Sequence, residues 1–236
     1  MHFPFEQFPA LNAIGICRHV FTQRIRGVDV SSDKAEVLDR LDAAHRKIRD
    51  MARMGDWPLF TSKQVHGNNI AVIDETGSAL RVGRARRTAS LPGHEIPMSD
   101  GLITNQLGVA LGIYVADCCA VYVVDPKTPA LGLVHSGRKG TELGVVTNAI
   151  KQMIDRFGSN PALMMVQLSP CIRPPHYEVD FAADIVRQCQ ELGVQQIHDS
   201  GICTACDLER YYSYRAEKGK TGRMLAVLGL DQIVAS

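Results

Sequence analysis

Apolar residues along the chain recur at two spacings, and this pattern divides the sequence into helical and extended segments. Apolar positions three or four residues apart indicate a helix with one buried face. This spacing predicts three helices, which are 32–54 with Ser31 or Ser32 as N-cap, 141–157 with Gly158 as the stop, and 179–192 with Gly193 as the stop.

Short apolar runs rich in β-branched and aromatic residues predict the strands. The expected strands are 15–22, two pieces of 58–74 separated by a turn at residues 66–68, 101–104, 109–117, 120–125, 130–135, 163–168 and 224–230. We expect the four runs between 101 and 135 to form the central sheet. Segment 79–98 has no apolar period and contains Arg84, Arg86 and Arg87, which predicts an exposed loop.

The alternation of strands and helices indicates an α/β (α+β) protein with mixed β-sheets flanked by helices. A length of 236 residues with 45% hydrophobic content is enough for one full core. The pattern shows no repeat and no low-complexity linker, so we expect a single domain over residues 1–236.

Charge and cysteine content exclude several classes of protein. The 26 Lys and Arg against 25 Asp and Glu give a net charge of +1, which provides no broad field to attract nucleic acid. The chain has neither a secretory signal pattern nor an apolar run of about 18 residues, so we expect a cytoplasmic protein without a membrane partner. Its seven scattered cysteines are an odd number, and we expect reduced thiols.

A predicted hairpin brings two potential metal ligands together. Residues 125–128, Asp-Pro-Lys-Thr, have the composition of a type I turn between two strands. With the pairing centred between Pro126 and Lys127, Cys118 and His135 are directly opposed, which places their Cβ atoms about 5 Å apart. A longer loop would change this register.

His66 is the third candidate ligand, because it lies where two apolar strands are interrupted. Two His and one Cys leave the fourth position of a zinc ion open, which is the catalytic arrangement. A cysteine is often just a small buried hydrophobe, and a strand histidine is often a hydrogen-bonded core residue. Spacing alone therefore leaves both interpretations open.

Several sequence strings together resemble one family. They are QVHG at 64–67, ADC at 116–118, HSG at 135–137, SPCIRPPHYEV at 169–179, and YYSYR with TGRM at 211–224. The family is that of the polyphenol-oxidase or laccase-like proteins, and the resemblance covers nearly the whole chain. It implies a fold similar to that of Cys-His hydrolases, and a zinc ion held by His66, Cys118 and His135, which would also be the catalytic residues. It further implies phosphorolysis of adenosine, inosine, guanosine and methylthioadenosine, and deamination of adenosine.

The implied partners are a purine nucleoside and phosphate, with the protein a monomer or homodimer. Loop 136–141 opens a predicted helix, so its backbone N–H groups and its two cations favour phosphate binding. Arg24 matches the arginine of the family's F-T-x-R segment and is a second phosphate candidate. The predicted substrate-binding and phosphate-binding residues are Arg24, Gln64, Ser136, Arg138, Lys139 and Arg173.

The chain departs from the family pattern in two segments. HSGRKG replaces the usual H-A-G-W-R-G, which removes a stacking tryptophan and puts Lys139 in the place of an arginine. SPCIRPPHYEV replaces the common Gly-Pro-Cys-Cys before Tyr-Glu-Val, so Arg173 and His176 are peculiar to this chain. His176 is a candidate ligand-facing group, although loop histidines are more often solvated. These changes bear mainly on substrate preference.

Two further features have competing interpretations. Cys203 and Cys206 form a lone CxxC, and without a partner pair we interpret it as structural. Tyr211, Tyr212 and Tyr214 either wall a base pocket or pack as half-buried residues.

Two other functions stay open from the sequence. The first is a Cys-His hydrolase acting on an amide or a cell-wall intermediate, with Cys118 as a thiolate nucleophile. The second is a nucleoside-binding relative with reduced catalysis. A copper oxidase is disfavoured, because the eight histidines contain no HxH pair to supply a multi-copper ligand set.

Overall fold

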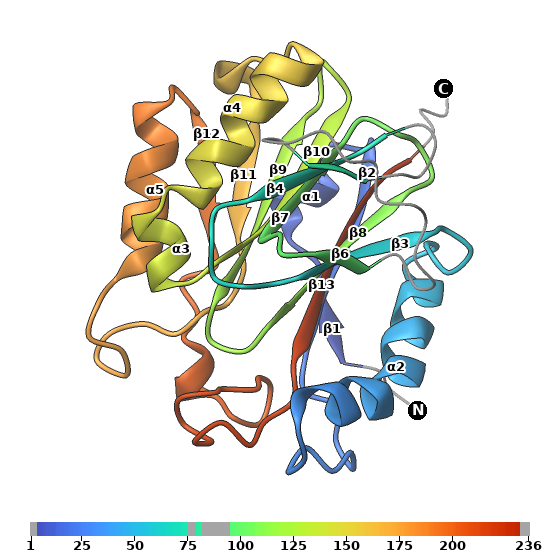
Figure 1. Ribbon diagram of the computed structural model, residues 1–236, viewed down its shortest axis with the longest axis vertical. Coiled ribbons are helices and arrows are strands. Elements are labelled where there is room, and N and C mark those ends of the chain that lie inside the picture. Colours follow the sequence, from blue (N-terminus) through green and yellow to red (C-terminus); the bar gives the residue numbers. More distant parts are fainter. Residues whose placement is uncertain (1–3, 75–78, 82–94, 232–236) are drawn as a thin grey trace.

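Two mixed β-sheets lie face to face at the centre of the protein, and helices cover their outer faces (Figure 1). The computed structural model describes residues 4–74, 79–81 and 95–231. This architecture confirms the fold class expected from the sequence. Within those ranges, no helix combines the length and the apolar character needed to cross a membrane.

The first sheet has six strands in the described ranges, in the order β1-β2-β13-β8-β3-β6. They are β1 Phe5–Glu6, β2 Cys17–Thr22, β13 Met224–Leu230, β8 Ala110–Val115, β3 Leu59–Lys63 and β6 Glu95–Pro97. β13 runs antiparallel to β2 and β8, whereas β3 runs parallel to β8 and β6. The last strand of the sequence therefore lies in the middle of this sheet.

The second sheet has seven strands in the same described ranges, in the order β12-β11-β9-β10-β7-β4-β5. They are β12 Gln196–Asp199, β11 Met165–Leu168, β9 Cys119–Asp125, β10 Ala130–Ser136, β7 Gly101–Thr104, β4 Ile70–Ile73 and β5 Ala79–Arg81. β3 and β4, which the sequence placed on either side of His66, thus belong to different sheets.

Two expectations about this region are wrong. The run 109–117 does not join its neighbours in one central sheet, because β8 pairs with β13 and β3, which are distant in the sequence. Segment 79–98 is not entirely loop, since β5 and β6 pair with β4 and β3 at its two ends. The predicted exposure of Arg84, Arg86 and Arg87 concerns positions outside the described residues.

The first long helix, α2, spans Lys34–Met51 and follows the predicted segment closely. Its N-cap is Asp33, whose carboxylate accepts hydrogen bonds from the N–H groups of Ala35 and Glu36 at 2.8 and 3.2 Å. The predicted N-cap at Ser31 or Ser32 is therefore wrong, because the aspartate next to them in sequence satisfies the free N–H groups instead.

The predicted helix over 141–157 is divided in two. α3 spans Arg138–Glu142 and α4 spans Val145–Phe157, with Gly144 between them in the left-handed conformation at φ 69°. Gly158 ends α4 at φ 72°, which confirms the predicted stop. The other helices described are α1 Pro9–Asn12 and α5 Phe181–Glu191, with 3-10 turns η1 Pro161–Leu163 and η2 Thr204–Cys206.

Three hydrophobic clusters explain the layering. The largest lies between the sheets and contains Tyr122, Leu133 and Leu228. The second lies between the seven-stranded sheet and helices α4 and α5, and the third lies between the six-stranded sheet and α2. The central strands are therefore buried on both faces, which explains why β9, β10 and β13 are apolar along nearly their whole length and do not alternate.

The β9–β10 hairpin has a different register from the one predicted. His135 pairs with Ala120, two positions from the expected partner Cys118. The loop is longer than a two-residue turn, since Asp125 pairs with Ala130 and residues 126–129 lie between the strands. Asp125 Oδ1 stabilises this loop by accepting hydrogen bonds from the N–H groups of Lys127 and Thr128. A shift of two residues keeps a side chain on the same face of a strand, so Cys118 and His135 still face the same side.

Candidate metal centre

Three side chains from separate segments converge at one end of the two sheets. His66 lies in the turn between β3 and β4, Cys118 directly precedes β9, and His135 lies in β10. One ligand atom of each residue lies within 4.8 Å of those of the other two. The imidazole rings of His66 and His135 are 4.9 Å apart between centroids and meet at 79°. The structure thus places the three predicted ligands together, and metal binding by them stays a prediction.

The turn that carries His66 is held by the carboxylate of Asp100. This carboxylate accepts hydrogen bonds from the backbone N–H groups of Val65, His66 and Gly67, at 3.1, 2.9 and 2.7 Å. His66 adopts φ 57°, a left-handed conformation that non-glycine residues rarely occupy. Three charge-assisted hydrogen bonds stabilise this unusual turn. The side chain of His66 is exposed to solvent and lies beside Cys118 and His135.

Asp100 also orients His135. Its Oδ1 lies 2.9 Å from Nδ1 of the buried His135 ring. A proton on Nδ1 donates to this carboxylate, so Nε2 is left to face Cys118 and His66. Asp100 was not among the predicted site residues. The chain offers a faint signal, an acidic residue directly before an apolar strand, but only the fold shows which histidine it contacts.

Cys118 and His135 form a charged pair in the absence of a metal. Burial raises the pKa of Cys118, but the His135 charge and hydrogen bonds from both histidines outweigh it and lower the pKa to about 6. Burial likewise lowers the pKa of His135, but Cys118 and Asp100 raise it to about 9. Burial raises the pKa of Asp100, while bonds from His135 and Gly67 bring it below its usual value. The thiolate is therefore the stable form of Cys118, as metal binding requires.

Two neighbouring groups, Asp117 and Gly137, leave the sulfur of Cys118 little freedom. Asp117 adopts φ 80°, and its carboxylate accepts hydrogen bonds from the Thr204 hydroxyl at 2.7 Å and the Arg215 N–H at 2.6 Å. On the other side, a Cβ at Gly137 would lie 2.5 Å from Cys118 Sγ. The glycine of the HSG string is thus the residue type that leaves room for the sulfur.

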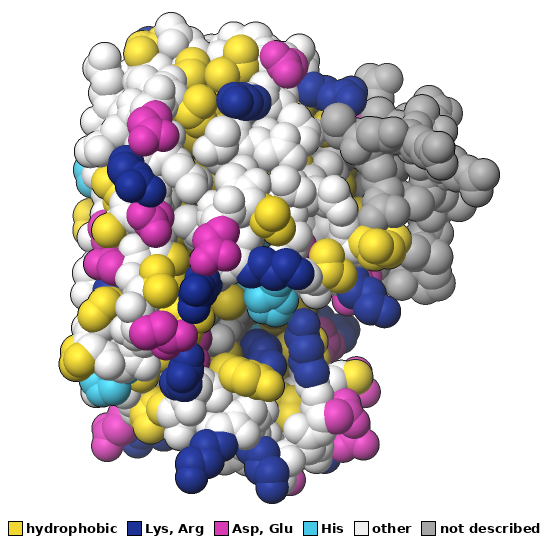
Figure 2. Space-filling model, turned by 60° about the vertical axis from the view of Figure 1, so that its left-hand side comes forward, with side chains coloured by type: hydrophobic (Ala, Val, Ile, Leu, Met, Phe, Trp, Pro, Cys, Tyr) yellow, Lys and Arg dark blue, Asp and Glu magenta, His cyan; other side chains and the backbone are white. Residues whose placement is uncertain are grey.

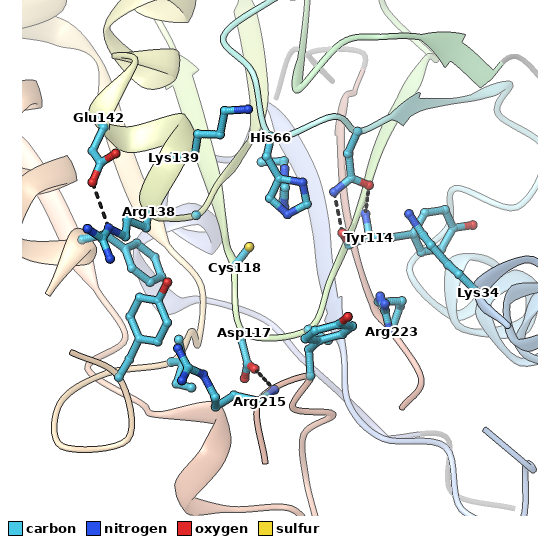
Figure 3. Close-up of a pocket in the computed structure, with 18 residues that line it drawn as sticks. Lys34, His66, Tyr114, Asp117, Cys118, Arg138, Lys139, Glu142, Arg215 and Arg223 are labelled. Atoms are coloured by element: carbon cyan, nitrogen blue, oxygen red, sulfur yellow. Dashed lines mark hydrogen bonds and ion pairs between the residues drawn. The ribbon is translucent and has the colours of Figure 1, made fainter. Parts of the chain in front are cut away.

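The three residues open into a cavity of about 910 Å³. Figure 2 shows a hollow on this face of the molecule with Lys and Arg side chains around it. In Figure 3, Arg138 and Glu142 lie on one side of His66 and Cys118, and Lys34 and Arg223 lie on the other. Cations at the cavity include Lys34, Arg138, Lys139, Arg215 and Arg223, and its aromatic walls include Tyr114, Tyr177, Phe181 and Tyr214.

Three of the predicted substrate-binding residues line this cavity. Arg138 forms ion pairs with Glu142 at 2.9 Å and Glu178 at 3.6 Å, so its charge is partly neutralised. Lys139 makes no ion pair within the described part of the chain. The amide of Gln64 lines the cavity but is bonded to the backbone of Tyr114, at 2.7 and 3.3 Å.

The other three predicted residues do not line the cavity. Arg24 pairs with Glu217 at 2.8 Å and stacks on a tyrosine ring. Ser136 is buried and bonds to the hydroxyl of Thr141 at 2.8 Å. Arg173 forms an ion pair with Asp199. Their proposed contact with substrate stays untested, and the geometry gives each of them a structural partner.

Two cavity cations were not among the predicted site residues. Arg223 is half-buried and burial lowers its pKa, so its charge lies where an anion would interact strongly. Burial also lowers the pKa of Lys34, but its side chain is exposed, so solvent screens its charge more. Arg223 belongs to the TGRM string, and its guanidinium lies 5.7 Å from the ring of Tyr214. Of the three tyrosines noted in the sequence, Tyr214 lines the cavity, whereas Tyr211 and Tyr212 are buried in the core.

The donor set fits a borderline-soft metal ion. Two imidazoles and a thiolate are the ligand types that zinc prefers, and they occupy three of its four tetrahedral positions. The carboxylate behind His135 is the outer partner that zinc-bound histidines usually have. The cavity on the open side would admit a reactant to the fourth position.

Comparison with known proteins identifies the family. The model of a family described as multi-copper polyphenol oxidoreductase laccase matches residues 18–186 and 179–231. The chain belongs to this laccase family. This confirms the resemblance seen in the sequence.

Relatives of this laccase family member have names that refer to nucleosides. It is 29% identical over 249 residues to a purine nucleoside phosphorylase of Corynebacterium glutamicum, covering 91% of this chain and 95% of that protein. It is 25% identical to the purine nucleoside phosphorylase YlmD of Bacillus subtilis, covering 92% and 86% of the two chains.

Two solved structures share the fold. The Bacillus licheniformis hypothetical protein YfiH superposes with a TM-score of 0.80 at 21% identity, over 98% of this chain and 97% of that one. YlmD from Geobacillus stearothermophilus superposes with a TM-score of 0.76 at 23% identity, over 98% and 100%. The chain thus shares its overall architecture with these two proteins.

Proposed function

We propose that this protein is a zinc-dependent purine nucleoside phosphorylase that acts on adenosine, inosine, guanosine and methylthioadenosine, and that it also deaminates adenosine. The observation that carries the proposal is the convergence of His66, Cys118 and His135 at a cavity lined by cations and aromatic rings. The names of its relatives support the choice of substrate.

His66, Cys118 and His135 would hold the zinc ion, which when bound supplies Lewis-acid activation of a reactant in the cavity. Asp100 fixes the ring of His135 and the turn of His66, so both ligands are preorganised. The half-buried thiolate of Cys118 carries negative charge into the site, which balances part of the charge of a divalent ion.

Phosphate binding is assigned to the cations on both sides of the centre. Phosphorolysis forms a bond from a phosphate oxygen to C1′ of the sugar and breaks the bond from C1′ to the base, and the base nitrogen gains a proton. Lys139, Lys34 and Arg223 are the cavity cations without a carboxylate partner among the described residues. α3 has only five residues, so we rest the assignment on these charges and not on its N-terminus.

The purine base would stack against an aromatic wall. Tyr177 and Tyr214 line the cavity, and the guanidinium of Arg215 lies 4.9 Å from the ring of Tyr177. These rings offer the stacking surface that the family's missing tryptophan in HSGRKG would otherwise supply. An aromatic surface on which a purine base can stack is therefore present although Arg138 stands where the family has tryptophan.

Product analysis tests the proposal. Zinc-loaded protein is incubated with each nucleoside, with and without phosphate, and base, ribose 1-phosphate, inosine and ammonia are followed. We expect phosphate-dependent release of base and ribose 1-phosphate, and phosphate-independent conversion of adenosine to inosine and ammonia. The Cys118→Ala variant should form neither set of products. If the zinc-loaded protein binds nucleosides in calorimetry but forms no product, it is a binding relative with reduced catalysis.

A second candidate function is a Cys-His hydrolase that acts on an amide or a cell-wall intermediate. It is favoured by one observation, the thiolate–imidazolium pair of Cys118 and His135 with Asp100 behind the histidine. Metal analysis separates the two functions. One equivalent of zinc that is lost in Cys118→Ala favours the phosphorylase, whereas a zinc content that Cys118→Ala leaves unchanged, with rapid alkylation of Cys118 by iodoacetamide in the unsubstituted protein, favours the hydrolase.

The cytoplasmic location and the monomeric or homodimeric state stay predictions from the sequence. Cell fractionation and sedimentation velocity of the full chain test them.

A further inference from the structure

A second group of potential metal ligands lies outside the candidate metal centre. His176 belongs to the loop between β11 and α5, Cys203 is the N-cap of the turn η2, and Cys206 is the last residue of that turn. Their ligand atoms also lie within 4.8 Å of one another. Nδ1 of His176 is 3.4 Å from Sγ of Cys206 and 3.8 Å from Sγ of Cys203. We call these three residues the second cluster.

The backbone brings the second cluster together. Cys171 and Cys203 form an isolated parallel bridge, in which Cys171 N–H donates to Ile202 O at 3.1 Å and Thr204 N–H donates to Cys171 O at 3.2 Å. The turn η2 closes with a bond from Cys206 N–H to Cys203 O at 3.2 Å. This turn places both sulfurs of the CxxC string within reach of the loop that carries His176.

The thiol of Cys203 also donates a weak hydrogen bond to Arg173 O at 3.9 Å, but this bond does not account for the position of both sulfurs beside one ring nitrogen. Nδ1 of a neutral imidazole has a single lone pair and accepts one thiol proton, yet both sulfurs lie close to it. In a tetrahedral zinc site with Zn–S near 2.3 Å and Zn–N near 2.0 Å, sulfur and nitrogen ligands are about 3.5 Å apart. The two observed distances lie close to this value, and one cation would satisfy all three atoms.

We propose that His176, Cys203 and Cys206 bind a second divalent cation of the zinc class. Two thiolates and an imidazole favour zinc over the harder magnesium or calcium ions. His176 and Cys206 are exposed, so the ion can enter from solvent and water can complete its coordination. This site explains both the lone CxxC and the histidine that is peculiar to this chain.

The ion would stabilise one wall of the cavity and takes no part in the reaction. It joins the segment 171–177, which contributes Ile172 and Tyr177 to the cavity, to the segment 203–206. The latter contains Thr204, whose hydroxyl holds the carboxylate of Asp117 next to Cys118. The second cluster thus supports the position of Cys118 through Thr204 and Asp117.

Metal content of the full-length Cys118→Ala variant tests the proposal independently of any activity, because this background removes a ligand of the first centre. Protein purified under reducing conditions should contain about one zinc ion per chain. The Cys118→Ala/Cys206→Ser double variant should contain almost none, and Cys118→Ala/Cys17→Ser, which removes a distant half-buried thiol, should retain it. Cobalt added to the metal-free Cys118→Ala variant should give thiolate charge-transfer absorption that the Cys206→Ser change abolishes.

The effect on the cavity wall has its own measurement. Removing zinc from the Cys118→Ala variant should accelerate amide hydrogen exchange in residues 171–177 and 203–206, with no change in β9 and β10. Absence of both zinc and cobalt binding in reduced Cys118→Ala protein would overturn the proposal. So would a mass spectrum of the same reduced protein showing a Cys203–Cys206 disulfide, since the two thiols would then be unable to act as ligands.

Discussion

Asp100 Oδ1 lies 2.9 Å from Nδ1 of His135, and the same carboxylate holds the backbone turn that presents His66. One acidic side chain therefore positions two of the three predicted ligands. It also connects the two sheets, since His66 follows β3 of one sheet and His135 lies in β10 of the other.

Replacing Asp100 with Asn should weaken metal binding without unfolding the protein. The amide keeps the shape of the carboxylate but loses its charge. Its NH2 group also cannot accept the hydrogen bonds that one of the two carboxylate oxygens accepts. Loss of such an outer partner typically costs about 10–100-fold in metal affinity. Chelator competition measures this affinity, and Asp184→Asn, on the exposed face of α5, is the matched control. An unchanged affinity in Asp100→Asn would show that the ligands need no such support.

Gly137→Ala should displace the sulfur of Cys118. The added Cβ would lie 2.5 Å from Sγ, while the backbone at φ −103° and ψ −172° suits any residue. We expect zinc affinity to fall at least about tenfold, with thermal stability nearly unchanged. Gly140→Ala is the control, since its nearest atom is 3.4 Å away. Equal zinc affinity in the two variants would contradict the close fit described at Cys118.

Lys139→Ala should impair phosphate binding more than nucleoside binding. The ammonium lines the cavity without an ion pair among described residues, so its charge is available to an anion. Losing one charge-assisted contact should raise the KM for phosphate about tenfold. Initial rates at varied phosphate measure this, with Lys127→Ala at the hairpin loop as control. A larger effect on the nucleoside KM than on the phosphate KM would mean that phosphate does not bind at Lys139.

Glu217 should make stability depend on pH in the acidic range. Burial raises its pKa, but bonds from Arg24, Thr221 and the Ser213 N–H outweigh this and lower the pKa below its usual value. A lowered pKa in the folded state means that the stabilisation is complete above the unfolded pKa of about 4.3 and is lost as pH falls through the folded value.

Glu217→Gln should therefore reduce the free energy of unfolding at neutral pH by about 2 kcal/mol, and by less in acid. Urea unfolding at several pH values measures the difference. Glu209→Gln is the control, because its ion pair with Arg26 is exposed and contributes little. A pH-independent loss in Glu217→Gln would show that packing, and not charge, is responsible.

The long buried strands and the main helices could be predicted from local pattern, and the family from its sequence strings, whereas the short strands β1, β5, β6 and β12 were not predicted. Cys118 and His135 were placed near each other by a hairpin whose register was wrong by two residues, and the even shift preserved their common face. Sheet membership could not be predicted, because β8 pairs with β13 and β3 through contacts that no local spacing encodes. For the same reason Asp100, Lys34 and Arg223 were missed as site residues, and the CxxC string had no visible partner until the fold placed His176 beside it.

The most direct test of the central claim is to titrate zinc into metal-free full-length protein while measuring phosphorolysis of inosine and adenosine. We predict that ribose 1-phosphate formation rises with zinc until the centre of His66, Cys118 and His135 is filled, and that Cys118→Ala stays inactive at any zinc concentration. Phosphorolysis of equal rate in metal-free protein, or none from any purine nucleoside in fully loaded protein, would contradict the account.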